Sequence, residues 1–158
     1  METRTQQHTS LPTENDTKMN IKIIGLMLTR DDKVVLKKWL SKYHDWFDII
    51  FCLDGSQRFK NESKALLEEF GVNYYHDDDF QFTKKSDQIL RGVVFQKIKT
   101  HIQAENDKNA EYWIFIAHPD EFYLTPFPKD IETAKKNNAE LIEYNVYHNF
   151  PHTSEIEI

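Results

Sequence analysis

The amino-acid sequence predicts an α/β fold with a mostly parallel β-sheet and helices on both of its faces. Short apolar runs alternate with longer segments whose apolar residues recur every three or four positions, and this alternation indicates βαβ units joined by right-handed crossovers. The run at residues 112–117 is apolar without interruption, as expected for a central strand that is covered on both faces. A length of 158 residues fits one domain.

Two strands and two helices are predicted between residues 21 and 71. Residues 21–28 form the first strand, and residues 29–32 (TRDD) open the first helix with an acidic first turn. Residues 48–53 form the second strand, and the helix that follows ends at Gly71. The apolar face of the first helix consists of Leu36, Trp39, Leu40 and Tyr43.

The second half of the chain predicts three more strands and two more helices. A short strand at 72–75 leads into the acidic stretch 76–79 and then into a long helix. The strand at 112–117 follows, then a helix at about 129–137 and a fifth strand at 141–147. The residues that the long helix would bury recur at every fourth position: Leu90, Val94, Ile98 and Ile102.

This order of elements indicates a Rossmann-like nucleotide-binding architecture. The glycine content reduces the number of nucleotide-binding classes that fit the sequence. The chain has only four glycines, and none has the G-x-G-x-x-G or Walker spacing, which argues against dinucleotide-binding and P-loop proteins. Residues 1–18 are polar, so we expect a disordered tail there. Residues 19–158 are then expected to form a single domain.

Composition excludes several classes of function. A net charge of −6 argues against a broad nucleic-acid surface. The lone Cys52 rules out an internal disulfide and, inside an apolar run, is expected to be a small core residue. No stretch reaches the roughly 20 apolar residues of a membrane span, and the N-terminus lacks an apolar signal core. We therefore expect a soluble, cytoplasmic protein.

Ligand-type side chains gather where the strand at 112–117 ends. His118 and Asp120 are two residues apart and Glu121 follows directly, so an extended backbone would place the imidazole and the first carboxylate on one side. Oxygen ligands suit Mg²⁺ or Mn²⁺, and an imidazole shifts the preference toward Mn²⁺. The alternative is a simple strand-end turn in which Pro119 ends the ladder.

Polar residues also follow the other predicted strands. Asp54 could accept hydrogen bonds from a base or a ribose, or could form an Asx turn. Thr29, Arg30 and Asp31 could contact a nucleotide or could cap a helix.

Two further groups have both a functional and a plain interpretation. Lys85 and Arg91 of the long helix could neutralise a diphosphate or lie in solvent. Residues 76–79 (HDDD) offer a rival metal site or a solvated acidic loop.

Together these residues resemble the GT-A fold glycosyltransferases, in particular the family-2-like group. That group has an Asp-x-Asp-Glu-Phe motif, which corresponds here to His118-Pro119-Asp120-Glu121-Phe122. The segment 28–40 is similar to the group's Asn-Glu and Leu-x-x-Trp-Leu opening, and 53–56 to its Asp-x-x-Ser segment. The resemblance covers roughly residues 21–147, with three motifs in the family's order.

The resemblance implies an enzyme that transfers a sugar from a nucleotide-sugar donor to a carbohydrate or other glycan acceptor. Thr29, Arg30 and Asp54 would contact the nucleoside, while Asp120, with His118, would hold Mn²⁺ or Mg²⁺ on the diphosphate. Arg91 or Lys85 would assist. Such a cation offsets charge on the leaving nucleoside diphosphate.

The chain departs from the family at two motif positions and at its C-terminal end. His118 replaces the first Asp of the motif, and Arg30-Asp31 replaces the Asn-Glu. The acceptor-binding half that usually carries the general base is expected to be short or missing after strand five. The candidates for a catalytic group are Asp120, Glu121 and His148, with His152 as a further histidine near the end.

Two other functions fit parts of the sequence. Residues 117–121 (AHPDE) are similar to the Ala-His-Pro-Asp-Asp-Glu motif of zinc-dependent N-acetylglucosaminyl deacetylases, with one Asp missing and in a different place along the chain. Alternatively, the chain is a catalytically inactive domain that binds a nucleotide sugar or a protein partner. Stoichiometric zinc would favour the deacetylase, and donor binding without transfer would favour the inactive domain.

Overall fold

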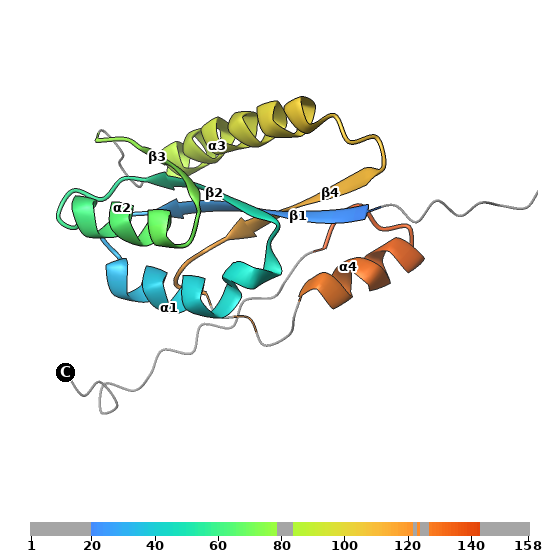
Figure 1. Cartoon of the computed structure of the whole chain (residues 1–158), viewed down its shortest axis with the longest axis horizontal. Coiled ribbons are helices and arrows are strands. Elements are labelled where there is room, and N and C mark those ends of the chain that lie inside the picture. The colour runs from blue at the N-terminus through green and yellow to red at the C-terminus, as the bar shows by residue number, and fades with distance from the viewer. Residues whose placement is uncertain (1–19, 79–83, 122, 124–126, 143–158) are drawn as a thin grey trace, which may run out of the picture.

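A computed structural model describes residues 20–78, 84–121, 123 and 127–142 (Figure 1). Its strands are β1 (Asn20–Thr29), β2 (Ile49–Asp54), β3 (Asn73–His76) and β4 (Ala110–Ala117). Its helices are α1 (Lys33–Tyr43), the 3₁₀ turn η1 (His44–Trp46), α2 (Lys60–Glu69), α3 (Lys84–Glu105) and α4 (Phe127–Lys136). The predicted tail at 1–18 lies outside the described residues.

The four strands form one parallel sheet in the order β3-β2-β1-β4. Their arrowheads all point to the same end of the molecule (Figure 1). Thr29 of β1 is paired with Asp54 of β2, which is paired in turn with His76 of β3. On the other side of β1, Met27 is paired with Ala117 of β4. The polar residues that follow the strands are therefore brought to one edge of the sheet, where α/β proteins bind ligands.

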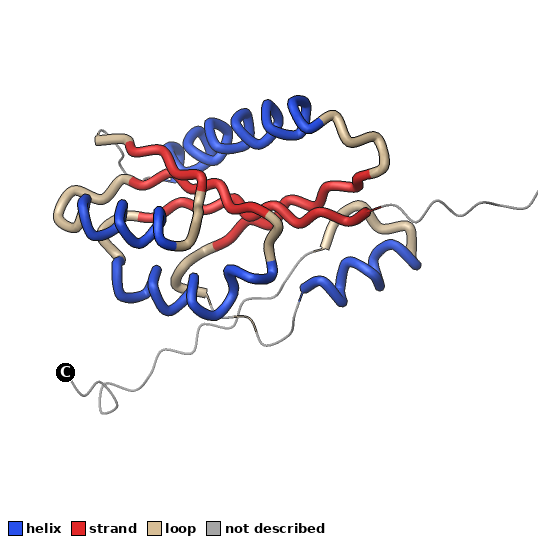
Figure 2. Tube along the Cα trace, viewed as in Figure 1, coloured by secondary structure: helices blue, strands red, loops and turns tan. Residues whose placement is uncertain are grey.

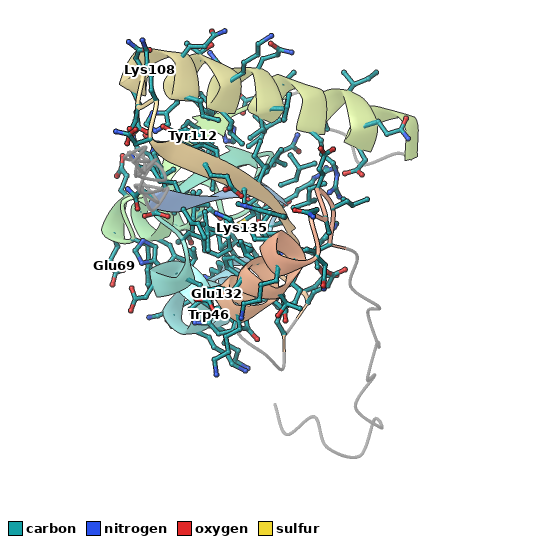
Figure 3. The ribbon with its side chains drawn as sticks, turned by 90° about the vertical axis from the view of Figure 1, so that its right-hand side faces the viewer. Trp46, Glu69, Lys108, Tyr112, Glu132 and Lys135 are labelled. Atoms are coloured by element: carbon teal, nitrogen blue, oxygen red, sulfur yellow. The ribbon has the colours of Figure 1, made fainter. Side chains whose placement is uncertain are left out.

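Helices cover both faces of the sheet, which confirms the predicted α/β class (Figure 2). The predicted apolar face of α1 is buried against Ile23 and Met27 of β1, in a cluster that also contains residues of α2 and α4. On the opposite face, Val94 and Ile98 of α3 pack on the alternate side chains of β1 and β2. Seen end-on, α3 lies on one side of the sheet and α1 with α4 on the other (Figure 3).

The position of β4 corrects one prediction, because β1 and not β4 is the most buried strand. Every residue from Ile23 to Thr29 is buried, whereas most of β4 is only half-buried and Ile116 is 50% exposed. The run at 112–117 is apolar because its two faces meet α3 and the α1/α4 layer. In the described part of the chain, however, no strand covers its outer edge.

Other boundaries shift by a few residues. The acidic first turn predicted for the first helix is wrong, since α1 begins at Lys33 and the two aspartates at 31 and 32 precede it. Gly71 does end the α2 segment, with the positive φ of 65° that favours glycine. Leu141 and Ile142 are in no strand, and the rest of the predicted fifth strand lies outside the described residues. Among the helices that the structure describes, none has the length and apolar character needed to cross a membrane.

Candidate functional site

A cavity of about 340 Å³ opens at the carboxyl ends of β1 and β4, beside the first turns of α3. Its volume is at the lower end of the range for small-molecule sites. A second cavity, of about 430 Å³, lies against β4 and the segment 139–142 and is lined mainly by apolar residues. The first cavity is the better functional candidate because ionisable groups from three elements converge on it. They are Arg30 and Asp32 after β1, Asp87 and Arg91 of α3, and His118 and Asp120 after β4.

Arg91 is held in place by two polar neighbours. Its Nε donates to Asp87 Oδ2 at 2.9 Å, and its Nη2 lies 3.2 Å from His118 Nε2. Because a guanidinium only donates, His118 Nε2 is the acceptor in this hydrogen bond. The pairing brings α3 to the end of β4 and leaves a positively charged group at the cavity wall.

Two carboxylates, one after β1 and one after β4, line the same cavity. Asp32 precedes α1 at the N-cap position but makes no side-chain capping bond, and Asp120 is exposed just after β4. Burial raises the pKa of Asp32, and the nearby charges of Asp120 and Asp31 raise it further. The two carboxylates therefore lie close enough to repel each other.

Asp31 holds the loop before α2 and is not among the residues that line the cavity. Its Oδ1 accepts the backbone N–H groups of Gln57, Arg58 and Phe59 at 2.9, 2.8 and 3.2 Å. Its own N–H donates to Ser56 Oγ at 2.8 Å, and its φ is 53°. Aspartate tolerates this left-handed conformation better than most residues. The geometry gives Asp31 a positioning role that joins the ends of β1 and β2.

Asp54 is fully buried at the end of β2. Its Oδ1 accepts the Ser56 N–H at 3.0 Å, while Oδ2 forms no hydrogen bond and lies 3.5 Å from His76 Nδ1. The carboxylate thus forms the predicted Asx turn and does not line the cavity. Cys52 is buried in the core as expected, and burial followed by the charge of Asp54 raises the pKa of its thiol.

The remaining candidates lie away from the cavity or outside the described residues. Glu121 Oε2 accepts the Tyr123 hydroxyl at 3.1 Å and does not line the cavity. In the acidic stretch 76–79, Asp78 Oδ1 pairs with Lys60 Nζ at 2.8 Å and His76 Nε2 at 2.9 Å. The side chain of Lys85, and His148 and His152 as a whole, fall outside the described part of the chain. In the part that is described, no three His, Cys, Asp or Glu residues group as metal ligands.

Two cavity residues were not predicted as site residues. Asp87 is four residues before Arg91, and this i,i+4 spacing within a predicted helix could have identified the pair. Asp32 was predicted to lie in the first turn of a helix. Nothing in the sequence indicates that its side chain lines a cavity and makes no capping bond to that helix. Its place in the cavity follows from the parallel pairing of β1 with β4, which brings the residues after both strands to the same edge of the sheet.

Comparison with protein families, with curated proteins and with solved structures finds no match to this chain.

Proposed function

We propose that this chain is a glycosyltransferase of the GT-A type that binds a nucleotide-activated sugar at the cavity between β1, β4 and α3. The observation that carries the proposal is the convergence of Arg91, His118 and Asp120 at the carboxyl edge of a parallel sheet. This edge is where open α/β sheets hold nucleotides. The three motifs that resemble the family are also adjacent there, since they follow β1, β2 and β4.

In this proposal Arg91 binds the diphosphate of the donor. Asp87 and His118 fix the guanidinium through Nε and Nη2, so its remaining N–H donors are preorganised for an anion. Charge-assisted hydrogen bonds from arginine to phosphate are stronger than neutral ones. Arg30 lines the same cavity and supplies a second guanidinium group. Negative charge that develops on the departing nucleoside diphosphate is stabilised by these fixed donors.

The residues present fit a divalent cation with oxygen ligands. Asp120 offers an exposed carboxylate, and Mg²⁺ or Mn²⁺ sites with one or two carboxylates commonly complete their coordination with phosphate and water. His118 Nε2 accepts from Arg91, so we assign the cation to Asp120 and the orientation of Arg91 to His118. When bound, the cation supplies additional positive charge against the diphosphate.

The nucleoside is held by Thr29 and Arg30, which line the cavity. The resemblance would also place Asp54 against it, but that carboxylate is fully buried between Ser56 and His76. We therefore propose that Asp54 and Asp31 shape the ends of β2 and β1 and act on the donor indirectly.

Isothermal titration with nucleoside diphosphates and nucleotide sugars, first with Mn²⁺ and then with EDTA, tests donor binding. We expect metal-dependent binding in the micromolar range, about −8 kcal/mol. Arg91→Gln should weaken it at least about tenfold, because one charge-assisted contact contributes about 1.5–3 kcal/mol. Arg58→Gln is the matched control, since Arg58 is exposed on the loop before α2. Absence of binding to every compound would contradict the proposal.

A transfer assay separates an enzyme from a domain that only binds. Release of the nucleoside diphosphate would be followed with each donor that binds, across a panel of glycan acceptors and in their absence. Release that depends on an acceptor supports the glycosyltransferase. Tight donor binding without release on any acceptor would identify the inactive binding domain instead.

A further inference from the structure

We propose that the outer edge of β4 is the contact surface of a homodimer, in which the β4 strands of two copies pair antiparallel about a two-fold axis. The four-stranded sheets of the two copies then join into one continuous sheet. This inference is independent of the proposed function, because none of the residues 110–117 lines the cavity at the carboxyl ends of the strands.

The two edges of the sheet differ in how well they are protected against pairing with another chain. Short strands, lysine and proline protect the edges of natural sheets. β3 has only four residues, and Asp78, just after it, pairs with Lys60. β4 has eight residues, without lysine or proline, and no strand in the described part of the chain pairs with its outer side. Its one charged residue, Glu111, is already bound by Lys135 and Trp113.

An exposed apolar patch, formed by Phe95 and Ile116, lies beside this edge on the α3 face of the sheet. Phe95 of α3 is 44% exposed and Ile116 of β4 is 50% exposed. Arg91 contacts His118, Phe95 is one helical turn after Arg91, and Ile116 is two residues before His118. Because α3 runs opposite to β4, one turn of about 5.4 Å and two strand residues of about 6.6 Å lead in the same direction. The two side chains therefore lie at the same level of the sheet.

The handedness of crossover connections argues against a parallel strand after α4 as the cover of this edge. α1 and α2 make the steps from β1 to β2 and from β2 to β3 on one face, and α3 returns to β4 on the other. α4 lies on the face of α1 (Figure 3), where Ile131 belongs to the same core cluster. A parallel strand added outside β4 after α4 would thus need a left-handed crossover, and nearly all crossovers are right-handed. Antiparallel pairing with a second copy needs no crossover.

The sequence of β4 is complementary to itself in an antiparallel pair. Its five bulky apolar residues are consecutive, from Tyr112 to Ile116, and Ile114 is in the middle. A pair centred on Ile114 sets Tyr112 opposite Ile116 of the second copy and Trp113 opposite Phe115 of the second copy. Pairs of aromatic and β-branched residues are favourable in these positions. The same register brings the Phe95–Ile116 patch of each copy to the tyrosine of the other, and such a two-fold contact closes at two copies.

Sedimentation velocity of the full chain at increasing protein concentration tests the dimer. Wild type should shift from monomer to dimer as the concentration rises. Phe95→Lys and Ile116→Lys should each weaken the dimer at least about tenfold, because each places a charge in an apolar contact. Ile89→Lys is the matched control, since Ile89 is 62% exposed on another side of α3. A monomeric wild type, or folded lysine variants that dimerise as well as Ile89→Lys, would overturn the proposal.

Disulfide cross-linking tests the arrangement of the two strands without adding a charge. Ile114→Cys places two thiols opposite each other across the axis, within the range that a disulfide spans. The two thiols of Ile116→Cys would be roughly 13 Å apart along the strands and out of reach. Cys52 is buried in both variants. Oxidation with diamide should convert Ile114→Cys, but not Ile116→Cys, to a covalent dimer. Equal cross-linking of the two variants, or none in either, would contradict the proposed pairing.

Hydrogen exchange of the peptide 110–117 separates the dimer from cover by the chain itself. An unpaired edge leaves backbone N–H groups open to solvent, so in the dimer their protection should rise with protein concentration. Full protection in a monomer would mean that the edge is covered within one chain, and would overturn the proposal. Exchange that is equally fast at every concentration would do the same.

Discussion

Replacement of Asp31 should destabilise the protein by an amount that depends on both its carboxylate and its backbone conformation. Asp31 Oδ1 accepts three backbone N–H groups of residues 57–59. Hydrogen bonds to a charged acceptor contribute about 1.5–3 kcal/mol each when they are buried. Residues 57 and 58 are exposed, so their N–H groups would regain water. We therefore expect the three bonds together to contribute only about 2 kcal/mol.

The φ of 53° at Asp31 adds a second contribution to the loss of unfolding free energy. An alanine there would bear a left-handed penalty of about 1 kcal/mol, which glycine avoids. Asp31→Ala should then lose about 3 kcal/mol and Asp31→Gly about 2 kcal/mol of unfolding free energy. Asp31→Asn keeps an acceptor oxygen and a residue that tolerates φ > 0, so it should lose only about 1 kcal/mol.

Urea unfolding of wild type and the three Asp31 variants is followed by circular dichroism. The differences in unfolding free energy are calculated from the urea midpoints with one m value for all four proteins. The reasoning is refuted if Asp31→Ala lies within about 0.5 kcal/mol of wild type. It is also refuted if Asp31→Gly is less stable than Asp31→Ala. Asp31→Asn also tests the positioning role. If this variant folds but loses nucleotide binding, Asp31 contacts the ligand directly.

Two further predictions concern the core and one ion pair. Gly25→Ala should cost about 1–3 kcal/mol, because the new Cβ would lie 3.1 Å from the Phe47 ring. Gly92→Ala meets nothing within 4 Å and should stabilise α3 by up to about 1 kcal/mol; thermal melts compare the two, and a Gly25→Ala variant as stable as wild type would contradict the packing argument. Hydrogen bonds from Lys135 and Trp113 lower the pKa of Glu111. Glu111→Gln should therefore cost about 0.5 kcal/mol at pH 7. This cost should disappear as the pH falls through the lowered pKa, because the wild-type carboxylate is then protonated too; urea midpoints at pH 7 and pH 3 would show a constant difference if the pair is irrelevant.

Most elements of the fold could be predicted because their signals are local. The periodic apolar residues of α1 and α3 identified both helices and their buried faces. Gly71 marked the end of α2, since few other residues adopt its positive φ. The class of the sheet followed from the alternation of strands and helices.

Which strand is the most buried could not be predicted in the same way. The run at 112–117 and the strand β1 are both apolar, and either could be central by composition. Which strand lies inside depends on the order β3-β2-β1-β4, and this order is set by contacts between residues far apart in the chain. For the same reason the sequence predicted a buried strand where Ile116 is half exposed.

Local patterns along the chain predict where polar residues follow each strand and which of them could bind a nucleotide or a cation. Which of these residues lie close together depends on the packing of the whole domain. This packing placed Asp32, Arg91, His118 and Asp120 around one cavity and left Asp31 and Asp54 in the loops that support it. The physical reason is that strand ends are local features of the chain. The distance between two side chains, by contrast, depends on how the strands are ordered and on where α3 crosses the sheet.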